Sequence, residues 1–144
     1  MATFKPVYDA HATVTGGRAG QGRTDDGRLE VSLSKPAGLG GDDGPGTNPE
    51  QLFAVGWAAC FEGAIGAVAG DTDVSQVSID ATVQLGKTSS GLGLAATLAV
   101  TLPGVDDARA VELVHAAHQV CPYSVATRGN VPTTLTANGQ AVEG

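Results

Sequence analysis

NPEQLFAVGWAACFEGAIGAVAG, residues 48–70, is the stretch that decides the fold. Asn48 can cap a helix, Pro49 suits the first helical position, and Glu50 favours the positive end of the helix dipole. The glycine at the end of the stretch is a common stop signal. We therefore expect one long helix that begins at Pro49 and runs to about Ala69.

The same stretch raises the question of a membrane span. Residues 52–70 are apolar or small at every position except Glu62. That length could cross a bilayer, but a carboxylate near the centre is costly there, and about half of the positions are Ala or Gly. We interpret the segment as a buried helix of a soluble protein.

Two strands are expected before this helix. Residues 7–15 alternate loosely, and residues 28–34 alternate more cleanly between apolar and polar side chains. Asp26-Gly27 is a hairpin turn signal before the second strand. Residues 35–47 contain five glycines and two prolines, which predicts a long loop.

After the helix, residues 74–87 and 92–102 predict a hairpin that turns at Ser89-Ser90-Gly91. A second helix should begin near Asp106 and break at Pro122, because proline lacks the backbone N–H that continues a helix. A last strand is expected over residues 131–137. With hairpins rather than crossovers, this order predicts an α+β fold in which an antiparallel sheet packs on two main helices, as one domain over residues 1–144.

Composition narrows the function. The 144 residues carry a formal net charge of −7 with a pI of about 4.6, which argues against nucleic acids and anionic membranes as partners. The first residues have no apolar run typical of a secretory signal. We expect a cytoplasmic protein in a reducing compartment, where cysteines are more often catalytic than structural.

Cys60 and Cys121 are the only cysteines, and their spacing excludes a CxxC motif. Taken alone, they can be small buried apolar residues or a redox pair, and the sequence leaves both readings open. His115, His118 and Cys121 recur every three residues, but no fourth ligand is evident, so a metal site is not expected.

The segments around the cysteines resemble the signatures of the Ohr/OsmC family, and in particular its Ohr branch. The matching segments are Gly16-Gly17-Arg18, Thr47-Asn48-Pro49-Glu50-Gln51-Leu52-Phe53-Ala54 with Ala58-Ala59-Cys60-Phe61, and His118-Gln119-Val120-Cys121-Pro122-Tyr123-Ser124 with Ala126-Thr127-Arg128-Gly129-Asn130. The resemblance implies an intertwined homodimer and a cofactor-free peroxidase that reduces organic hydroperoxides. It also implies that lipoyl groups or another dithiol on a partner protein reduce the oxidised enzyme.

The resemblance also implies a role for each site residue. Cys60 would be the attacking thiol, which becomes a sulfenic acid, and Cys121 would resolve it as a disulfide. A thiol in an apolar helix needs a nearby cation to ionise, and Arg18 occupies that family position. Glu50 would hold the Arg18 guanidinium in a bidentate pair. The relatives often carry an acidic residue where this chain has Ala19.

Helix geometry constrains the position of Glu50. Ten residues separate Glu50 from Cys60, which corresponds to about 15 Å along one helix. An antiparallel crossing of two such helices near Val55 and Gly56, where glycine permits close approach, would bring Glu50 of one chain beside Cys60 of the other. We therefore expect composite active sites at a two-fold interface.

Substrate preference has weaker support. Five apolar residues can line a pocket suited to alkyl or fatty-acyl hydroperoxides, and ordinary core packing explains each of them equally well: Leu39, Phe53, Trp57, Phe61 and Tyr123. Two other functions remain open at this point. One is an OsmC-like peroxidase with a broader substrate range, and the other is a sensor that uses the disulfide as a switch.

Overall fold

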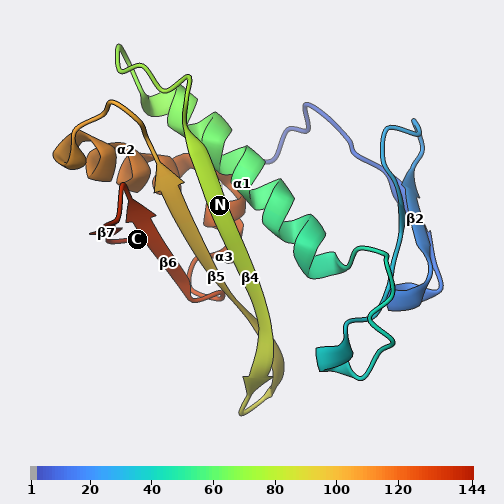
Figure 1. Cartoon of the computed structure of the whole chain (residues 1–144). Coiled ribbons are helices and arrows are strands. Elements are labelled where there is room, and N and C mark those ends of the chain that lie inside the picture. The colour runs from blue at the N-terminus through green and yellow to red at the C-terminus, as the bar shows by residue number, and fades with distance from the viewer. Residues whose placement is uncertain (1–2) are drawn as a thin grey trace. The chain divides into compact units, whose positions relative to one another are not determined.

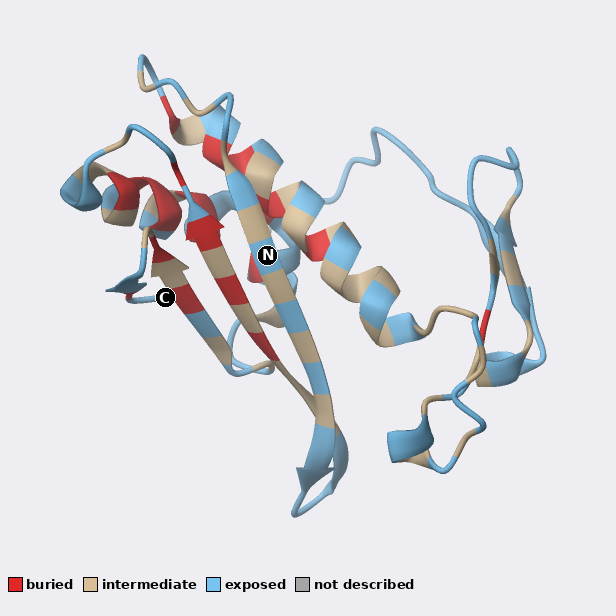
Figure 2. Ribbon diagram, viewed as in Figure 1, coloured by how far each residue is buried: buried red, intermediate tan, exposed pale blue. Residues whose placement is uncertain are grey.

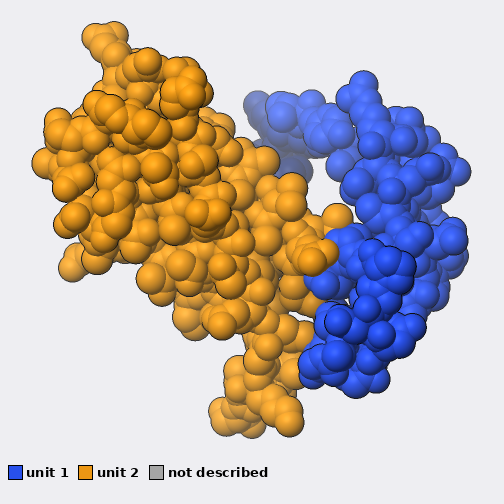
Figure 3. Space-filling model, in the orientation of Figure 1, with its two compact units in different colours: residues 1–49 blue, residues 50–144 orange. Residues whose placement is uncertain are grey.

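A computed structural model describes residues 3–144. The chain divides into two compact units, residues 1–49 and 50–144, which Figure 3 colours separately. The expectation of one domain over residues 1–144 stays a prediction.

The first unit contains a three-stranded antiparallel sheet in the order β1-β2-β3 (Figure 1). Its strands are β1 (Ala12–Thr15), β2 (Gln21–Thr24) and β3 (Glu30–Ser32), and its short 3-10 helices are η1 (Gly17–Ala19) and η2 (Ala37–Leu39). The turn signal at Asp26-Gly27 does close a hairpin, and Gly27 has a φ of 73°. The first strand of this hairpin is β2, which was not predicted. Of the strand expected over residues 7–15, only Ala12–Thr15 forms, as β1.

The second unit contains a four-stranded sheet and three α-helices. The helices are α1 (Pro49–Val68), α2 (Asp107–Val120) and α3 (Pro122–Thr127). The strands, in the sheet order β4-β5-β6-β7, are β4 (Ser78–Thr88), β5 (Gly91–Thr101), β6 (Thr133–Ala137) and β7 (Gln140–Val142). The expected long helix, the hairpin after it and the helix break at Pro122 are all confirmed.

The sheet differs from the expected antiparallel one at β5 and β6, which pair in parallel. The connection through α2 and α3 is a crossover, so β6 starts again at the same end of the sheet as β5. Strand β7 was also not predicted. Asn138 and Gly139 form its tight turn with φ values of 48° and 82°, as a type I′ hairpin requires.

One face of this sheet and the helices enclose the core (Figure 2). Alternate residues of β5 point into it, namely Ala96, Leu98 and Val100, and the partners of this row on β4 pack against the same core. Alanines fill much of the space between the larger side chains: Ala64, Ala96, Ala110, Ala117 and Ala137. On the opposite face of β4, the side chains are polar and exposed.

Helix α1 is buried along one face only. Trp57, Phe61 and Ile65 are fully buried, whereas Val55 is 70% exposed and Ala59 is exposed. By length and composition alone α1 could cross a membrane, with a mean hydropathy of 1.4, and 17% of that stretch is buried within the chain. Within the single chain, the expectation of a buried helix is therefore confirmed for one face, and the other face is exposed.

Candidate active site

Cys60 lies on α1 between the buried core and the exposed face of the helix. Its neighbours Trp57, Phe61 and Ala64 are buried, whereas Cys60 itself is partly exposed. The helix carries no proline or break between Pro49 and Cys60 that would make the thiol mobile. Cys60 is thus held on a continuous helix and is partly exposed.

Cys121 lies at the corner between α2 and α3. Its φ and ψ of −62° and 121° are extended, so it ends one helix and caps the next, which starts at Pro122. Its amide donates to the Ala117 carbonyl, and its own carbonyl accepts from the Val125 amide. The side chain is completely buried.

The fold brings these two thiols together across 61 positions of sequence. The Sγ atoms of Cys60 and Cys121 are 3.6 Å apart, and both cysteines are free. A disulfide needs a separation of about 2.05 Å, so the sulfurs must close by only about 1.5 Å. The arrangement can form a disulfide without a large rearrangement of either helix.

Burial raises the pKa of the Cys60 thiol, and the adjacent Cys121 thiol raises it further. The backbone N–H of Tyr123, near the start of α3, opposes this increase by hydrogen bonding to the sulfur. Because burial has the largest effect, Cys60 needs an additional positive charge to become a thiolate near neutral pH.

Aromatic side chains of α1 and α3 pack against one another. Phe53 stacks on Trp57 at a ring distance of 5.4 Å, and its ring is tilted against Tyr123 at 6.0 Å. The Trp57 indole Nε1 donates to Ser124 Oγ at 3.2 Å inside the core. Phe53 is half-buried and Tyr123 is 40% exposed, so these two can contact a ligand.

Two of the five predicted pocket residues belong to the core instead. Trp57 and Phe61 have no exposed surface, and the Phe61 ring packs 6.4 Å from the ring of His118. Core packing explains both of them fully, since neither presents surface to a substrate. Leu39 is half-buried on η2 of the first unit.

Arg18 and Glu50, the two predicted charged residues of the site, lie on η1 and at the start of α1. Arg18 is half-buried on η1 in the first unit, and its approach to Cys60 stays a prediction. Glu50 occupies the first turn of α1, whose unbroken helix separates it from Cys60 of the same chain by about 15 Å. Glu50 is therefore too far along the helix to act at Cys60 of its own chain, which is the premise of the composite site.

Gly56 makes a different close approach from the one expected. A Cβ atom built on Gly56 would lie 3.2 Å from the Tyr123 hydroxyl of the same chain. Within the chain this glycine faces α3, and the expectation that it permits close approach of a partner helix stays a prediction. The neighbouring residue Val55 lies on the exposed face of α1.

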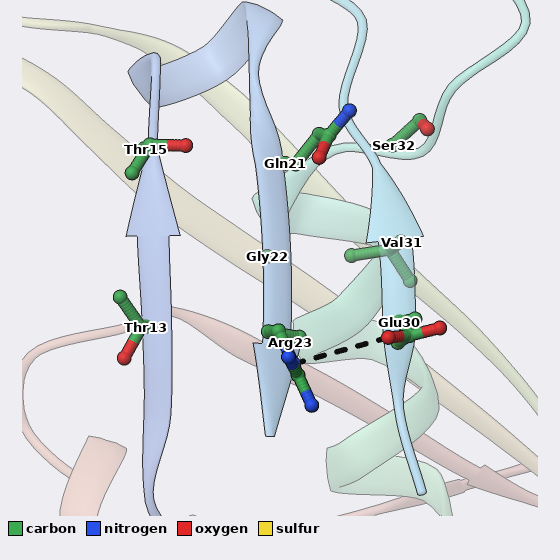
Figure 4. A pocket seen from close by; sticks show the side chains of 8 residues that line it. All are labelled: Thr13, Thr15, Gln21, Gly22, Arg23, Glu30, Val31 and Ser32. Atoms are coloured by element: carbon green, nitrogen blue, oxygen red, sulfur yellow. Dashed lines mark ion pairs between the residues drawn. The ribbon is translucent and has the colours of Figure 1, made fainter. Parts of the chain in front are cut away.

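Two other candidate sites, a metal site and a surface depression, do not include the two cysteines. Among residues 3–144, no group of three or more His, Cys, Asp and Glu side chains is arranged to hold a metal ion. His115 Nδ1 is instead 2.9 Å from the Glu143 carbonyl. A polar depression on the three-stranded sheet contains the ion pair between Arg23 and Glu30, at 3.8 Å (Figure 4). None of the predicted site residues lines it.

Sequence reasoning assigned no role to Ser124 and Arg128. Ser124 bonds Trp57, and Arg128 Nη2 donates to the His118 carbonyl at 2.6 Å. Both residues were part of the second family-like segment, which was the available signal. Proline at position 122 was a further signal, since it leaves a carbonyl of α2 without its usual donor.

Comparison with known proteins agrees with this geometry. The family model for OsmC-like protein matches residues 40–136. An organic hydroperoxide resistance protein of Xanthomonas axonopodis pv. citri is 52% identical over 135 residues, which cover 92% of this chain and 95% of the relative. The Bacillus subtilis organic hydroperoxide resistance protein OhrB is 41% identical over 132 residues, or 90% of this chain and 96% of the relative.

Solved structures show the same fold. The crystal structure of a putative organic hydroperoxide resistance protein from Vibrio cholerae, with captopril bound in one of its active sites, matches with a TM-score of 0.90. Its sequence is 42% identical, and the match covers 98% of this chain and 99% of that one. A Legionella pneumophila organic hydroperoxide resistance protein matches with a TM-score of 0.87 at 44% identity, over 92% of this chain and 98% of that one.

Proposed function

Because this chain belongs to the OsmC-like protein family and to its organic hydroperoxide resistance branch, we propose that it is a thiol-dependent peroxidase. It reduces alkyl or fatty-acyl hydroperoxides to alcohols. The observation that carries the proposal is the 3.6 Å contact between the Sγ atoms of Cys60 and Cys121.

The difference in exposure supports the order of the two thiols. Cys60 is partly exposed and Cys121 is completely buried, so a peroxide can reach Cys60 first. The Cys60 thiolate attacks the terminal oxygen of the hydroperoxide, and the O–O bond breaks. The alkoxide leaves and takes a proton to become the alcohol, while Cys60 becomes a sulfenic acid.

The second step consumes the sulfenic acid. The Cys121 thiol loses its proton, and its sulfur attacks the Cys60 sulfur. The S–S bond forms, the S–O bond breaks, and hydroxide leaves with a proton as water. A dithiol such as a lipoyl group on a partner protein then reduces the disulfide and becomes a cyclic disulfide itself. No cofactor is required in this scheme.

Activation of Cys60 requires the cation already inferred from its raised pKa. Arg18 supplies this charge, and Glu50 of a second copy holds the guanidinium at a two-fold interface. The exposed side of α1 around Val55 and Ala59 supports this arrangement, because a homodimer would remove that apolar surface from water. We propose that the working enzyme is a cytoplasmic homodimer.

The partly exposed aromatic side chains support an organic substrate. Phe53 and Tyr123 present apolar surface near the thiols, and an alkyl group can bury against that surface while hydrogen peroxide cannot. Phe53 and Tyr123 therefore contribute to discrimination between the two classes of peroxide.

A peroxidase assay tests the proposal. The wild type, Cys60→Ser and Cys121→Ser are compared with cumene hydroperoxide and hydrogen peroxide, using dihydrolipoamide or thioredoxin as the reductant. We expect multiple turnover with the organic peroxide and dihydrolipoamide, and no peroxide consumption by Cys60→Ser. Full activity of Cys60→Ser, or a single oxidation without turnover in the wild type, contradicts the proposal.

A further inference from the structure

The corner between α2 and α3 contains a carbonyl that the helix cannot satisfy. In an α-helix, the carbonyl of residue i accepts from the amide of residue i+4. For His118 that residue is Pro122, which has no N–H. The helix ends here, and the extended ψ of 121° at Cys121 turns the chain into α3.

Arg128 supplies the missing donor. Its Nη2 atom donates to the His118 carbonyl at 2.6 Å, a short distance typical of a charge-assisted hydrogen bond. The backbone N–H of Arg128 in turn donates to the Ser124 carbonyl at 3.0 Å, which holds Arg128 at the end of α3. The Arg128 side chain thus joins the end of α3 to the last turn of α2.

This bond spans the corner that carries the buried thiol. Cys121 lies between His118 and Arg128 in the sequence, and the Arg128 side chain connects the last turn of α2 with the end of α3 across it. Cys60, by contrast, is on α1, which this bond does not join. The bond therefore restrains one of the two sulfurs much more than the other.

We propose that Arg128 is a positioning residue for disulfide formation, which keeps Cys121 Sγ within reach of Cys60 Sγ by replacing the amide donor that Pro122 lacks. This inference rests on the proposed function for its role in turnover. The step that it assists is the attack of the Cys121 sulfur on the sulfenic sulfur of Cys60, with the departing hydroxide protonated to water. If the corner loosens, the sulfenic acid persists and a second peroxide oxidises it to the sulfinic acid.

The test separates the two chemical steps. Arg128→Gln and Arg128→Lys are compared with the wild type and with Arg28→Gln, a matched control at an exposed turn. Single-turnover mixing with cumene hydroperoxide, followed by acid quench and mass spectrometry, gives the rates of Cys60 oxidation and of disulfide formation. A second arm forms the same disulfide with diamide, which requires no peroxide chemistry.

We expect disulfide formation in Arg128→Gln to slow by about tenfold or more, the size expected for loss of a hydrogen bond to a charged donor. Oxidation of Cys60 should stay within about twofold of the wild type, and sulfinic acid should accumulate at high peroxide. Arg128→Lys, which keeps a cationic donor, should recover part of the rate. Arg28→Gln should match the wild type in both steps.

Several results would overturn the inference. One is disulfide formation at the wild-type rate in both Arg128 variants, and another is an equal loss in both chemical steps. If Arg128→Gln does not fold, the diamide rate of Arg128→Met decides, because Met keeps an unbranched apolar side chain without any donor, and a wild-type rate in that variant excludes a positioning role. Failure of the peroxidase proposal appears differently, as a wild type that forms the disulfide with diamide but does not consume organic peroxide.

Discussion

The Trp57 indole and the Ser124 hydroxyl form a buried hydrogen bond at 3.2 Å that links α1 to α3. Trp57 precedes Cys60 by three positions, and Ser124 follows Cys121 by three. The bond therefore lies one helical turn from the thiol contact on both elements. It fixes the distance between the two segments that carry the sulfurs.

Removing this bond should destabilise the protein. Ser124→Ala leaves the indole N–H buried without an acceptor, so we expect a loss of about 1–3 kcal/mol in the free energy of unfolding. Urea denaturation followed by circular dichroism measures it. Ser75→Ala, at an exposed serine, should change stability by no more than about 0.5 kcal/mol.

A double-mutant cycle with Trp57→Phe isolates the pair itself. Trp57→Phe removes the donor, so the further loss caused by Ser124→Ala should be smaller in that background by about 1 kcal/mol. Additivity to within about 0.3 kcal/mol would show that the bond contributes nothing of its own to stability.

Gly56 and Tyr123 should be coupled. Alanine at an exposed helix interior position stabilises by about 1 kcal/mol relative to glycine. At Gly56, a Cβ would meet the Tyr123 hydroxyl at 3.2 Å, whereas the nearest ring carbon would be at 3.6 Å, an ordinary contact. We therefore expect Gly56→Ala to stabilise Tyr123→Phe by about 0.5–1 kcal/mol more than it stabilises the wild type.

Gly63→Ala is the control for this cycle. A Cβ at Gly63 meets no atom of the chain within 4 Å, so its effect should not depend on the residue at position 123. Thermal or urea unfolding of the variants gives the comparison. An equal effect of Gly56→Ala in both backgrounds would mean that the Tyr123 hydroxyl moves aside without cost.

The exposed face of α1 should be the dimer contact. Val55→Glu places a charge where the side chain is 70% exposed in the single chain, so the fold should persist while the proposed homodimer dissociates. Light scattering coupled to gel filtration measures the mass, and circular dichroism measures the fold. Ala108→Glu, an exposed position on α2, should stay dimeric. A dimeric Val55→Glu variant would place the interface elsewhere.

His118 should make stability depend on pH. Burial lowers the pKa of His118 below its ordinary value of 6.5, and the nearby positive charges of Arg128 and His115 lower it further. In this range the unfolded chain binds more protons than the folded one. The free energy of unfolding should therefore fall as the pH falls from about 7 through 6.5 toward the lower folded-state pKa.

Substitution of the histidine identifies the source of that slope. His118→Gln should reduce the loss of stability between pH 7.5 and about 5.5, a range above that in which most carboxylates titrate. Identical slopes in the wild type and His118→Gln would assign the pH dependence to another group.

Much of the local structure followed from short-range signals. The start of α1 at Pro49, the β4–β5 hairpin and the helix break at Pro122 all depend on the conformational preferences of a few adjacent residues. Such preferences act within the chain segment itself, so they can be read without knowing its surroundings. The family-like segments around Cys60 and Cys121 likewise predicted the class of chemistry.

The tertiary structure alone decided how those segments meet. The parallel pairing of β5 with β6, the burial of Trp57 and Phe61, and the single buried face of α1 depend on packing between distant segments. No spacing in the sequence encodes such contacts directly, because side-chain packing is set by the whole core at once.

The active site shows the same division. The residues around Cys60 and Cys121 identified them as a redox pair by resemblance, but their 3.6 Å contact arises from the packing of α1 against the corner of α2 and α3. Pro122 showed that a helix must break, and only the folded chain shows that Arg128 satisfies the carbonyl left behind. Local chemistry can be read from neighbouring residues, whereas the distance between two reacting atoms depends on the complete fold.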